Sequence, residues 1–289
     1  MLIVTLIAQP GGLSLAQVNA LMAQWQGEDL RWLSEGEAAE FAVERAPGDQ
    51  WDVWQSLQGA QIDMVVQPKE GRRKAMLLAD MDSTMIGQEC IDELADEAGV
   101  GDHVKAITAR AMNGELDFEE ALVERVSLLK GLDSGIIQRV FEERITFTPG
   151  GKTLIATMKA HSGYAALVSG GFTSFTERVA DALGFDEHHA NTLLEEVGRL
   201  SGEVARPILG REAKVEALHR ISQAQGVTPD DVMAVGDGAN DLGMLGLAGS
   251  GVALHAKPVV AAECDLRINH GDLTALLYLQ GYDRDQFVE

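Results

Sequence analysis

Two hydrophobic patterns divide this chain. Up to about residue 70, alternating apolar runs typical of half-buried strands are interrupted by two apolar stripes at helical spacing. In chain order the expected elements are a strand at 2–8, a helix at 18–25, strands near 30–32 and 41–43, a helix at 53–57 and a strand at 62–66. This βαββαβ order predicts a small α+β unit with ferredoxin-like topology.

Residues 68–74 interrupt this pattern and predict a linker. The segment contains Pro68 and Gly71, which break regular structure, and four basic side chains. We therefore predict an N-terminal domain of residues 1–70 and a second domain of residues 71–289. The N-terminal unit resembles ACT-type regulatory domains, and this resemblance leaves open whether the unit binds a regulatory ligand or mediates dimerisation.

After the linker, short and wholly apolar runs alternate with amphipathic helices. The runs have the length and composition of strands buried on both faces of a parallel sheet. They lie at residues 75–79, 164–168 and 232–235. Between the first two runs, three helical stripes occur at residues 88–98, 104–107 and 117–129. The pattern predicts an α/β domain with a helical insertion, followed by a loop and hairpin at residues 186–210 in which His188 and His189 are surface residues.

Composition and charge narrow the function classes. The 289 residues carry a formal charge of −22, which disfavours nucleic acid as a partner because a polyanion would be repelled. A small phosphorylated substrate is still allowed if local cations neutralise it. The two cysteines lack disulfide or metal-ligand spacing, and no basic residue precedes Arg31 as a signal peptide would need. We therefore expect a cytoplasmic protein without a membrane span.

Polar side chains follow the buried strands where each one ends. Asp80 and Asp82 follow the first run, and Ser169-Gly170 follows the second. Ligands of open α/β sheets bind at the carboxyl ends of strands. Taken alone, the acidic pair is equally well explained as a polar turn, and Ser-Gly-Gly is usually only a turn. The backbone N–H groups of Ser169 and Gly170, ahead of a helix predicted at 175–183, would nevertheless suit phosphate oxygens.

The third run ends in Gly236-Asp237-Gly238, with Asn240 and Asp241 close behind. Acidic residues around glycines at a strand end suit a hard divalent cation such as Mg²⁺. Lys214 opens a helix before this strand, although most lysines in such positions are solvated. Phosphoryl transfer needs a nucleophile, a metal and positive charge or N–H donors around the phosphoryl oxygens. The strand ends offer a carboxylate nucleophile, metal ligands and N–H donors, and Lys214 at the helix start offers the positive charge.

Arg125 lies on the apolar side of the helix predicted at 117–129. An unpaired buried guanidinium is costly, so an inward-facing arginine favours an anionic ligand. The alternative is an arginine that extends its charged end to the surface at the edge of the stripe.

The ordered set of strand-end motifs resembles the haloacid dehalogenase (HAD) superfamily. The four matching motifs are Asp80-Met81-Asp82-Ser83-Thr84, Ser169-Gly170, Lys214 and Gly236-Asp237-Gly238-Ala239-Asn240-Asp241. The resemblance implies a Rossmann-like core of residues 75–86 and 146–289 and a helical cap of about residues 87–145. It also implies that Asp80 is a nucleophile, that Asp82 transfers protons, and that Ser169, Gly170 and Lys214 bind phosphate. Asn240 is a further candidate for substrate binding.

The same resemblance implies a Mg²⁺ cofactor. Its ligands would be the Asp80 carboxylate, the Asp82 backbone carbonyl and Asp237. Asp241 would orient water or the metal shell, either as a direct metal ligand or through contacts with the groups that bind the metal.

Within the superfamily, residues 75–280 most resemble the phosphoserine phosphatase family. In that family, the residue matching Glu89 holds the substrate ammonium and the residue matching Arg125 holds its carboxylate. The implied reaction is hydrolysis of O-phospho-L-serine in the last step of serine biosynthesis. The expected partner is this small molecule, and a homodimer is left open.

The sequence leaves three alternative functions open. The aspartyl-phosphate could pass to another alcohol such as homoserine, or the substrate could be a different small phosphomonoester. A non-catalytic, amino-acid-binding regulatory protein is the third, and the intact Asp80, Asp82, Lys214 and Asp237 argue against it.

Overall fold

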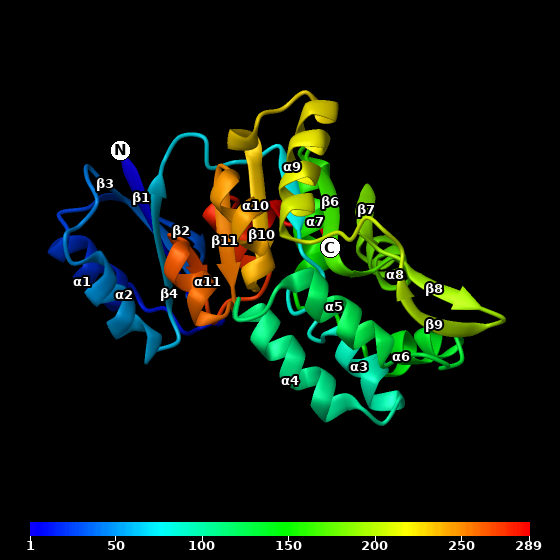
Figure 1. Cartoon of the computed structure of the whole chain (residues 1–289). Coiled ribbons are helices and arrows are strands. Elements are labelled where there is room, and N and C mark those ends of the chain that lie inside the picture. The colour runs from blue at the N-terminus through cyan, green and yellow to red at the C-terminus, as the bar shows by residue number, and fades with distance from the viewer.

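A four-stranded antiparallel sheet and a six-stranded parallel sheet organise the chain (Figure 1). The computed structural model describes all residues from 1 to 289. Its N-terminal unit has the predicted order of elements, with strand order β2-β3-β1-β4. The elements are β1 (Leu2–Ile7), α1 (Leu15–Gln24), β2 (Glu28–Ser34), β3 (Ala38–Val43), α2 (Gln50–Gln58) and β4 (Asp63–Pro68).

The parallel sheet has the strand order β12-β11-β10-β5-β6-β7, so β5 lies between β10 and β6. Its strands are β5 (Met76–Ala79), β6 (Tyr164–Phe172), β7 (Glu187–Asn191), β10 (Val232–Gly236), β11 (Ser250–Leu254) and β12 (Leu266–Ile268). Helices cover both faces: α7 (Gly151–Ala160), α8 (Thr173–Leu183), α9 (Arg211–Gln225), α10 (Leu242–Leu247), α11 (Pro258–Glu263) and α12 (Ala275–Leu279).

The residues of β5 show why its sequence is wholly apolar. Leu77 and Ala79 pack with side chains of α7, α8 and α12, whereas Met76 and Leu78 pack with side chains of α9, α10 and α11. All four are fully buried. A strand covered on both faces has no position for a polar side chain until it ends, and Asp80 is the first such position.

Four helices lie between β5 and α7 at one end of the parallel sheet (Figure 1). They are α3 (Cys90–Glu97), α4 (Gly101–Met112), α5 (Phe118–Ser127) and α6 (Ile136–Arg144). The chain leaves the sheet at Ile86 and returns at Phe147, and these two residues form an antiparallel bridge. The hairpin β8 (Leu193–Glu196) and β9 (Arg199–Val204) lies against α5.

The structure differs from the predicted elements in three places. Helix α6 is a fourth helix of the insertion, for which the sequence pattern predicts only three. Residues 187–191 form an edge strand of the parallel sheet instead of a loop, and His188 accordingly is half-buried, with Nδ1 2.9 Å from Thr176 Oγ1. A polar edge strand has no apolar run by which to predict it. Strand β6 also continues past Val168 to Phe172, because Ser169 and the glycines stay extended before α8 begins.

The N-terminal sheet packs firmly on the rest of the chain. Its second face contributes Ile7, Leu33 and Val65 to the same apolar core as α12. Asp63, fully buried at the start of β4, accepts backbone hydrogen bonds from Asn269 (2.8 Å), His270 (3.1 Å) and Gly271 (2.7 Å). No helix in the structure combines the length and the apolar composition needed to cross a bilayer.

We expect Asp63→Ala to lower the free energy of unfolding by about 2–4 kcal/mol, because it leaves three N–H groups without their acceptor. Urea unfolding measures this, with Asp52→Ala on the exposed side of α2 as the control. A loss no larger than that of the control would show that water replaces the carboxylate.

Candidate active site

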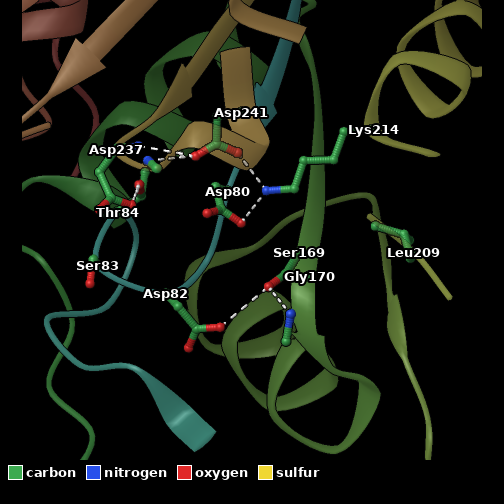
Figure 2. A network of polar contacts seen from close by, with 12 residues as sticks. Asp80, Asp82, Ser83, Thr84, Ser169, Gly170, Leu209, Lys214, Asp237 and Asp241 are labelled. Atoms are coloured by element: carbon green, nitrogen blue, oxygen red, sulfur yellow. Dashed lines mark hydrogen bonds and ion pairs between the residues drawn. The ribbon is translucent and has the colours of Figure 1, made fainter. Parts of the chain in front are cut away.

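The polar ends of three neighbouring strands converge (Figure 2). Asp80 follows β5, Asp237 follows β10 on one side, and Ser169 lies in β6 on the other side. Each of these side chains is at least nine-tenths buried. The site therefore forms because parallel strands end at the same edge of the sheet.

Lys214 joins the site from the first turn of α9. Its Nζ lies 2.7 Å from Asp80 Oδ1 and 2.6 Å from Asp241 Oδ1, and the side chain is fully buried. Burial disfavours the charged ammonium, but the carboxylates of Asp241 and Asp80 outweigh it and raise the pKa of Lys214. Lys214 is thus a fixed positive charge beside Asp80 and not a solvated lysine.

Asp80, Asp237 and Asp241 offer carboxylate oxygens within 4.8 Å of one another. The second oxygen of Asp241 accepts the backbone N–H groups of Asp237 (3.1 Å) and Gly238 (3.0 Å), which fixes its orientation. Burial, together with the charge of Asp241, raises the pKa of Asp80 to about 7. Three buried carboxylates facing one ammonium leave an excess of negative charge.

This excess fits a divalent cation. The buried Oδ2 of Asp237 has no hydrogen-bond partner, and the Lys257 Nζ lies 3.7 Å from it, beyond hydrogen-bonding distance. Burial raises the pKa of Asp237 well above its usual range, and the charges of Glu89 and Asp241 add to this. Hard oxygen ligands and uncompensated negative charge are the donor set that Mg²⁺ prefers.

Asp82 points away from the three-carboxylate group (Figure 2). Its Oδ1 accepts the Cys90 backbone N–H at 3.0 Å, and its Oδ2 accepts the Ser169 hydroxyl at 3.4 Å. Burial raises its pKa to about 6, an effect to which the neighbouring charge of Asp80 adds. A Cβ on Gly171 would collide with Asp82 Oδ2, so a side chain at this position would displace the Asp82 carboxylate.

A cavity of about 20 Å³ separates Asp80, Asp82 and Ser169 from the helices α3 to α5. That volume holds about one water molecule. Glu89, Arg125, Gly170 and Asn240 also line it, and the buried Asn240 Oδ1 has no hydrogen-bond partner. Every predicted substrate-binding residue therefore lines the cavity except Lys214, which contacts Asp80.

Glu89 contributes an acidic side chain to the lining of this cavity, and Arg125 contributes a basic one. Arg125 is 2 % exposed, which confirms the inward orientation predicted from the helical stripe. Glu89 accepts the Ser83 hydroxyl at 2.7 Å, and Ser83 adopts a left-handed backbone with φ of 55°. Burial, reinforced by the charge of Asp82, raises the pKa of Glu89 to about 7. An acidic and a basic side chain that line one small cavity suit a zwitterionic ligand.

The apolar lining of the cavity was not predicted as part of the site. It consists of Ile91, Met112, Phe118, Leu122 and Phe172. The sequence pattern assigned Phe118 to the helical core, yet a Cβ on Gly170 would lie only 2.5 Å from its ring. Phe118 therefore closes over the predicted phosphate-binding turn. Helical periodicity gives no signal for this contact, because Gly170 lies in a distant strand.

The haloacid dehalogenase-like hydrolase family model matches residues 77–246. The chain belongs to this family. Among its curated relatives is the phosphoserine phosphatase of Archaeoglobus fulgidus, which is 44 % identical over 74 % of this chain. The chain spans 63 % of the length of that relative. A second is the phosphoserine phosphatase of Methanocaldococcus jannaschii, 41 % identical over 71 % of this chain and 97 % of its own length.

A crystal structure of a HAD family hydrolase from Salmonella enterica superposes with a TM-score of 0.85. It is 29 % identical to this chain, and the superposition covers 96 % of this chain and 97 % of the Salmonella protein. The likeness therefore includes most of the N-terminal sheet as well as the parallel sheet.

Proposed function

We propose that this chain is a Mg²⁺-dependent phosphoserine phosphatase that hydrolyses O-phospho-L-serine through an aspartyl-phosphate on Asp80. The observation that carries the proposal is that Glu89 and Arg125 line the same cavity as Asp80 and Asp82. The carboxylate of Glu89 complements a substrate ammonium, and the guanidinium of Arg125 complements a substrate carboxylate. The names of both curated relatives support the same substrate.

In the first step, an Asp80 oxygen attacks phosphorus and the bond to the serine oxygen breaks. Asp82 donates a proton to that oxygen, a role favoured by its raised pKa of about 6 and its position on the cavity side. The Lys214 ammonium, 2.7 Å from Asp80, neutralises charge on the phosphorylated carboxylate. The Ser169 hydroxyl and the Gly170 N–H bind phosphoryl oxygens.

In the second step, Asp82 accepts a proton from a water molecule as that water attacks the phosphorus of the aspartyl-phosphate. The Asp80 carboxylate is released and inorganic phosphate forms. One carboxyl group can serve both steps because it leaves the first step deprotonated.

Asp80, Asp237 and the Asp82 backbone carbonyl would hold Mg²⁺, and Asp241 would orient Asp237 and the metal shell through its bonds to the Asp237 and Gly238 N–H groups. When bound, Mg²⁺ supplies positive charge for the phosphoryl oxygens. Lys257, whose Nζ lies 3.7 Å from Asp237 Oδ2, adds further positive charge beside these carboxylates.

We propose that residues 87–145 form a cap over a core of residues 75–86 and 146–289. A cavity for about one water is too small for phosphoserine, so the cap must open for the substrate to enter. The bridge between Ile86 and Phe147, where the chain leaves and re-enters the core, is the natural hinge. Closure then excludes bulk water from the phosphoryl group.

We also infer that the N-terminal unit, residues 1–70, is ACT-like, and that it binds an amino acid or mediates a homodimer. Its βαββαβ order supports this inference. The two free, buried cysteines favour a cytoplasmic location, where thiols stay reduced. Titration of the full-length protein with serine, followed by light scattering for mass, would separate the two roles of the unit.

Phosphate release from a panel of phosphomonoesters, with and without Mg²⁺, tests the proposed substrate. We expect phosphoserine to have the highest kcat/KM and activity to vanish when Mg²⁺ is chelated. A different preferred ester would replace phosphoserine as the substrate. Products formed in the presence of homoserine identify transfer to an alcohol, which would make the chain a phosphotransferase.

Ser169→Ala should lower kcat by a factor on the order of 10²–10³, the usual cost of removing one donor to a developing charge. The Ser169 hydroxyl is also 3.4 Å from Asp82, so part of the loss would reflect Asp82 orientation. Steady-state phosphate release measures the loss, and Ser174→Ala in α8 is the control. An activity equal to that of the control would remove Ser169 from the site.

A further inference from the structure

The guanidinium of Arg125 is held by cap residues that the proposed mechanism does not use. Its Nε donates to the Ala121 backbone carbonyl at 3.0 Å, and its Nη1 donates to the Thr108 hydroxyl at 3.0 Å. The remaining nitrogen, Nη2, makes no hydrogen bond to the protein. Two of the three nitrogens are therefore fixed, and one is available to the cavity that Arg125 lines.

Thr108 also forms a hydrogen bond to the carboxylate of Asp92. Its hydroxyl donates to Asp92 Oδ1 at 2.6 Å while it accepts from Arg125. A hydroxyl group can do both at once, which neither an amide nor an ammonium can do through a single atom. The Asp92–Thr108–Arg125 relay thus joins one residue from each of α3, α4 and α5.

The Thr108 hydroxyl lies between two opposite charges, Asp92 and Arg125. Arg125 has no carboxylate oxygen within 4.0 Å, although it is almost fully buried. A direct ion pair with Asp92 would satisfy the guanidinium and compete with an incoming carboxylate. Through Thr108, Asp92 stabilises the buried positive charge at a distance and leaves Nη2 unpaired.

We propose that Thr108 and Asp92 are positioning residues that orient Arg125 for the carboxylate of the substrate. This inference rests on the proposed phosphoserine specificity and extends it to two residues that contact no substrate. Neither lines the cavity. Their effect on turnover is therefore transmitted by Arg125 and is confined to substrates that carry a carboxylate.

The test compares two ligands that differ only in this group, O-phosphoserine and O-phosphoethanolamine. Thr108→Val keeps the shape of the side chain and removes the hydroxyl. We expect it to raise the KM for phosphoserine about tenfold, the effect of one lost hydrogen bond to a charged group, with little change in kcat. The KM, or the inhibition constant, for phosphoethanolamine should not change.

Thr108→Ser restores the hydroxyl and should return the KM for phosphoserine to near its original value. Asp92→Asn keeps an acceptor for Thr108 but removes the charge, and should give a smaller rise with the same selectivity. Asp92→Asn also tests the proposal if Thr108→Val does not fold. Thr176→Val, which removes a buried hydroxyl outside the cavity, is the matched control.

An equal rise for both ligands, or failure of Thr108→Ser to restore the KM, would show that the relay only holds the cap helices together. An unchanged KM in Thr108→Val would also overturn the proposal. If the unaltered protein turns over phosphoethanolamine or another ester but not phosphoserine, the proposed function fails first, and the inference fails with it.

Discussion

Asp80→Asn should abolish phosphate release, with kcat reduced by a factor on the order of 10⁴–10⁶, as found when a nucleophile is removed. The amide keeps the shape of the side chain but cannot form the acyl phosphate. Lys214 retains Asp241 as a partner at 2.6 Å, so we expect the site to stay folded. Sensitive measurement of phosphate release from phosphoserine at saturating Mg²⁺ gives the residual rate.

Asp63→Asn is the matched control for this variant. Asp63 is also a fully buried aspartate, but it lies between the N-terminal sheet and residues 269–271. We expect this control to lose stability and keep turnover below its unfolding temperature. Substantial turnover by purified Asp80→Asn, free of deamidation, would contradict a covalent route through Asp80.

Arg125→Ala should lower kcat/KM for phosphoserine by a factor on the order of 10²–10³, the cost of truncating one partner of a buried charged pair. Hydrolysis of p-nitrophenyl phosphate should fall far less, because that ester has no carboxylate. The physical reason is that Arg125 lines the cavity and that its Nη2 group makes no hydrogen bond to the protein. Steady-state kinetics on both esters measure the ratio.

Arg110→Ala provides the control for Arg125→Ala, since Arg110 lies in α4 with an exposed side chain and an ion pair to Glu115 at 3.6 Å. It should leave both esters unaffected. If Arg125→Ala lowers activity equally on both esters, Arg125 is structural, and the preference for phosphoserine needs another source.

The positions of Asp80 and Asp237 could be predicted from the way a buried strand ends, whereas Ser169 lies within β6 and not at its end. A strand buried on both faces must be apolar along its length, so the first polar residue marks its end. Parallel strands end together, which brings distant motifs to one edge. Arg125 could be predicted for a related reason, since a charge on an apolar stripe needs an anion.

Other parts of the fold and of the site could not be predicted. Strand β7 is a polar edge strand, so it has no apolar run, and α6 is a single short stripe at Ile136, Ile137 and Val140. The contact of Phe118 with Gly170 and the Thr108 relay depend on how the cap packs on the core and within itself. Helical periodicity gives the face of a helix, but it does not give the side chains on another element that this face meets.

Glu89 illustrates the same limit for a charged residue. An acidic residue next to a helix N-terminus is ordinary, because the helix dipole favours it there. In the structure the hydroxyl of Ser83, a residue with a left-handed backbone, donates to Glu89 Oε1, and the local sequence pattern does not predict this contact. Resemblance to a family, and not the local pattern, singled out Glu89 from the sequence.

The central claim is that Asp80 carries the phosphoryl group of phosphoserine. Rapid acid quenching of the protein during turnover of phosphoserine labelled with ³²P, followed by peptide mapping, measures this most directly. We predict a labelled peptide whose modified residue is Asp80, formed before free phosphate and absent from Asp80→Asn. Label on another residue, or release of phosphate with no labelled protein at any time, would contradict the account.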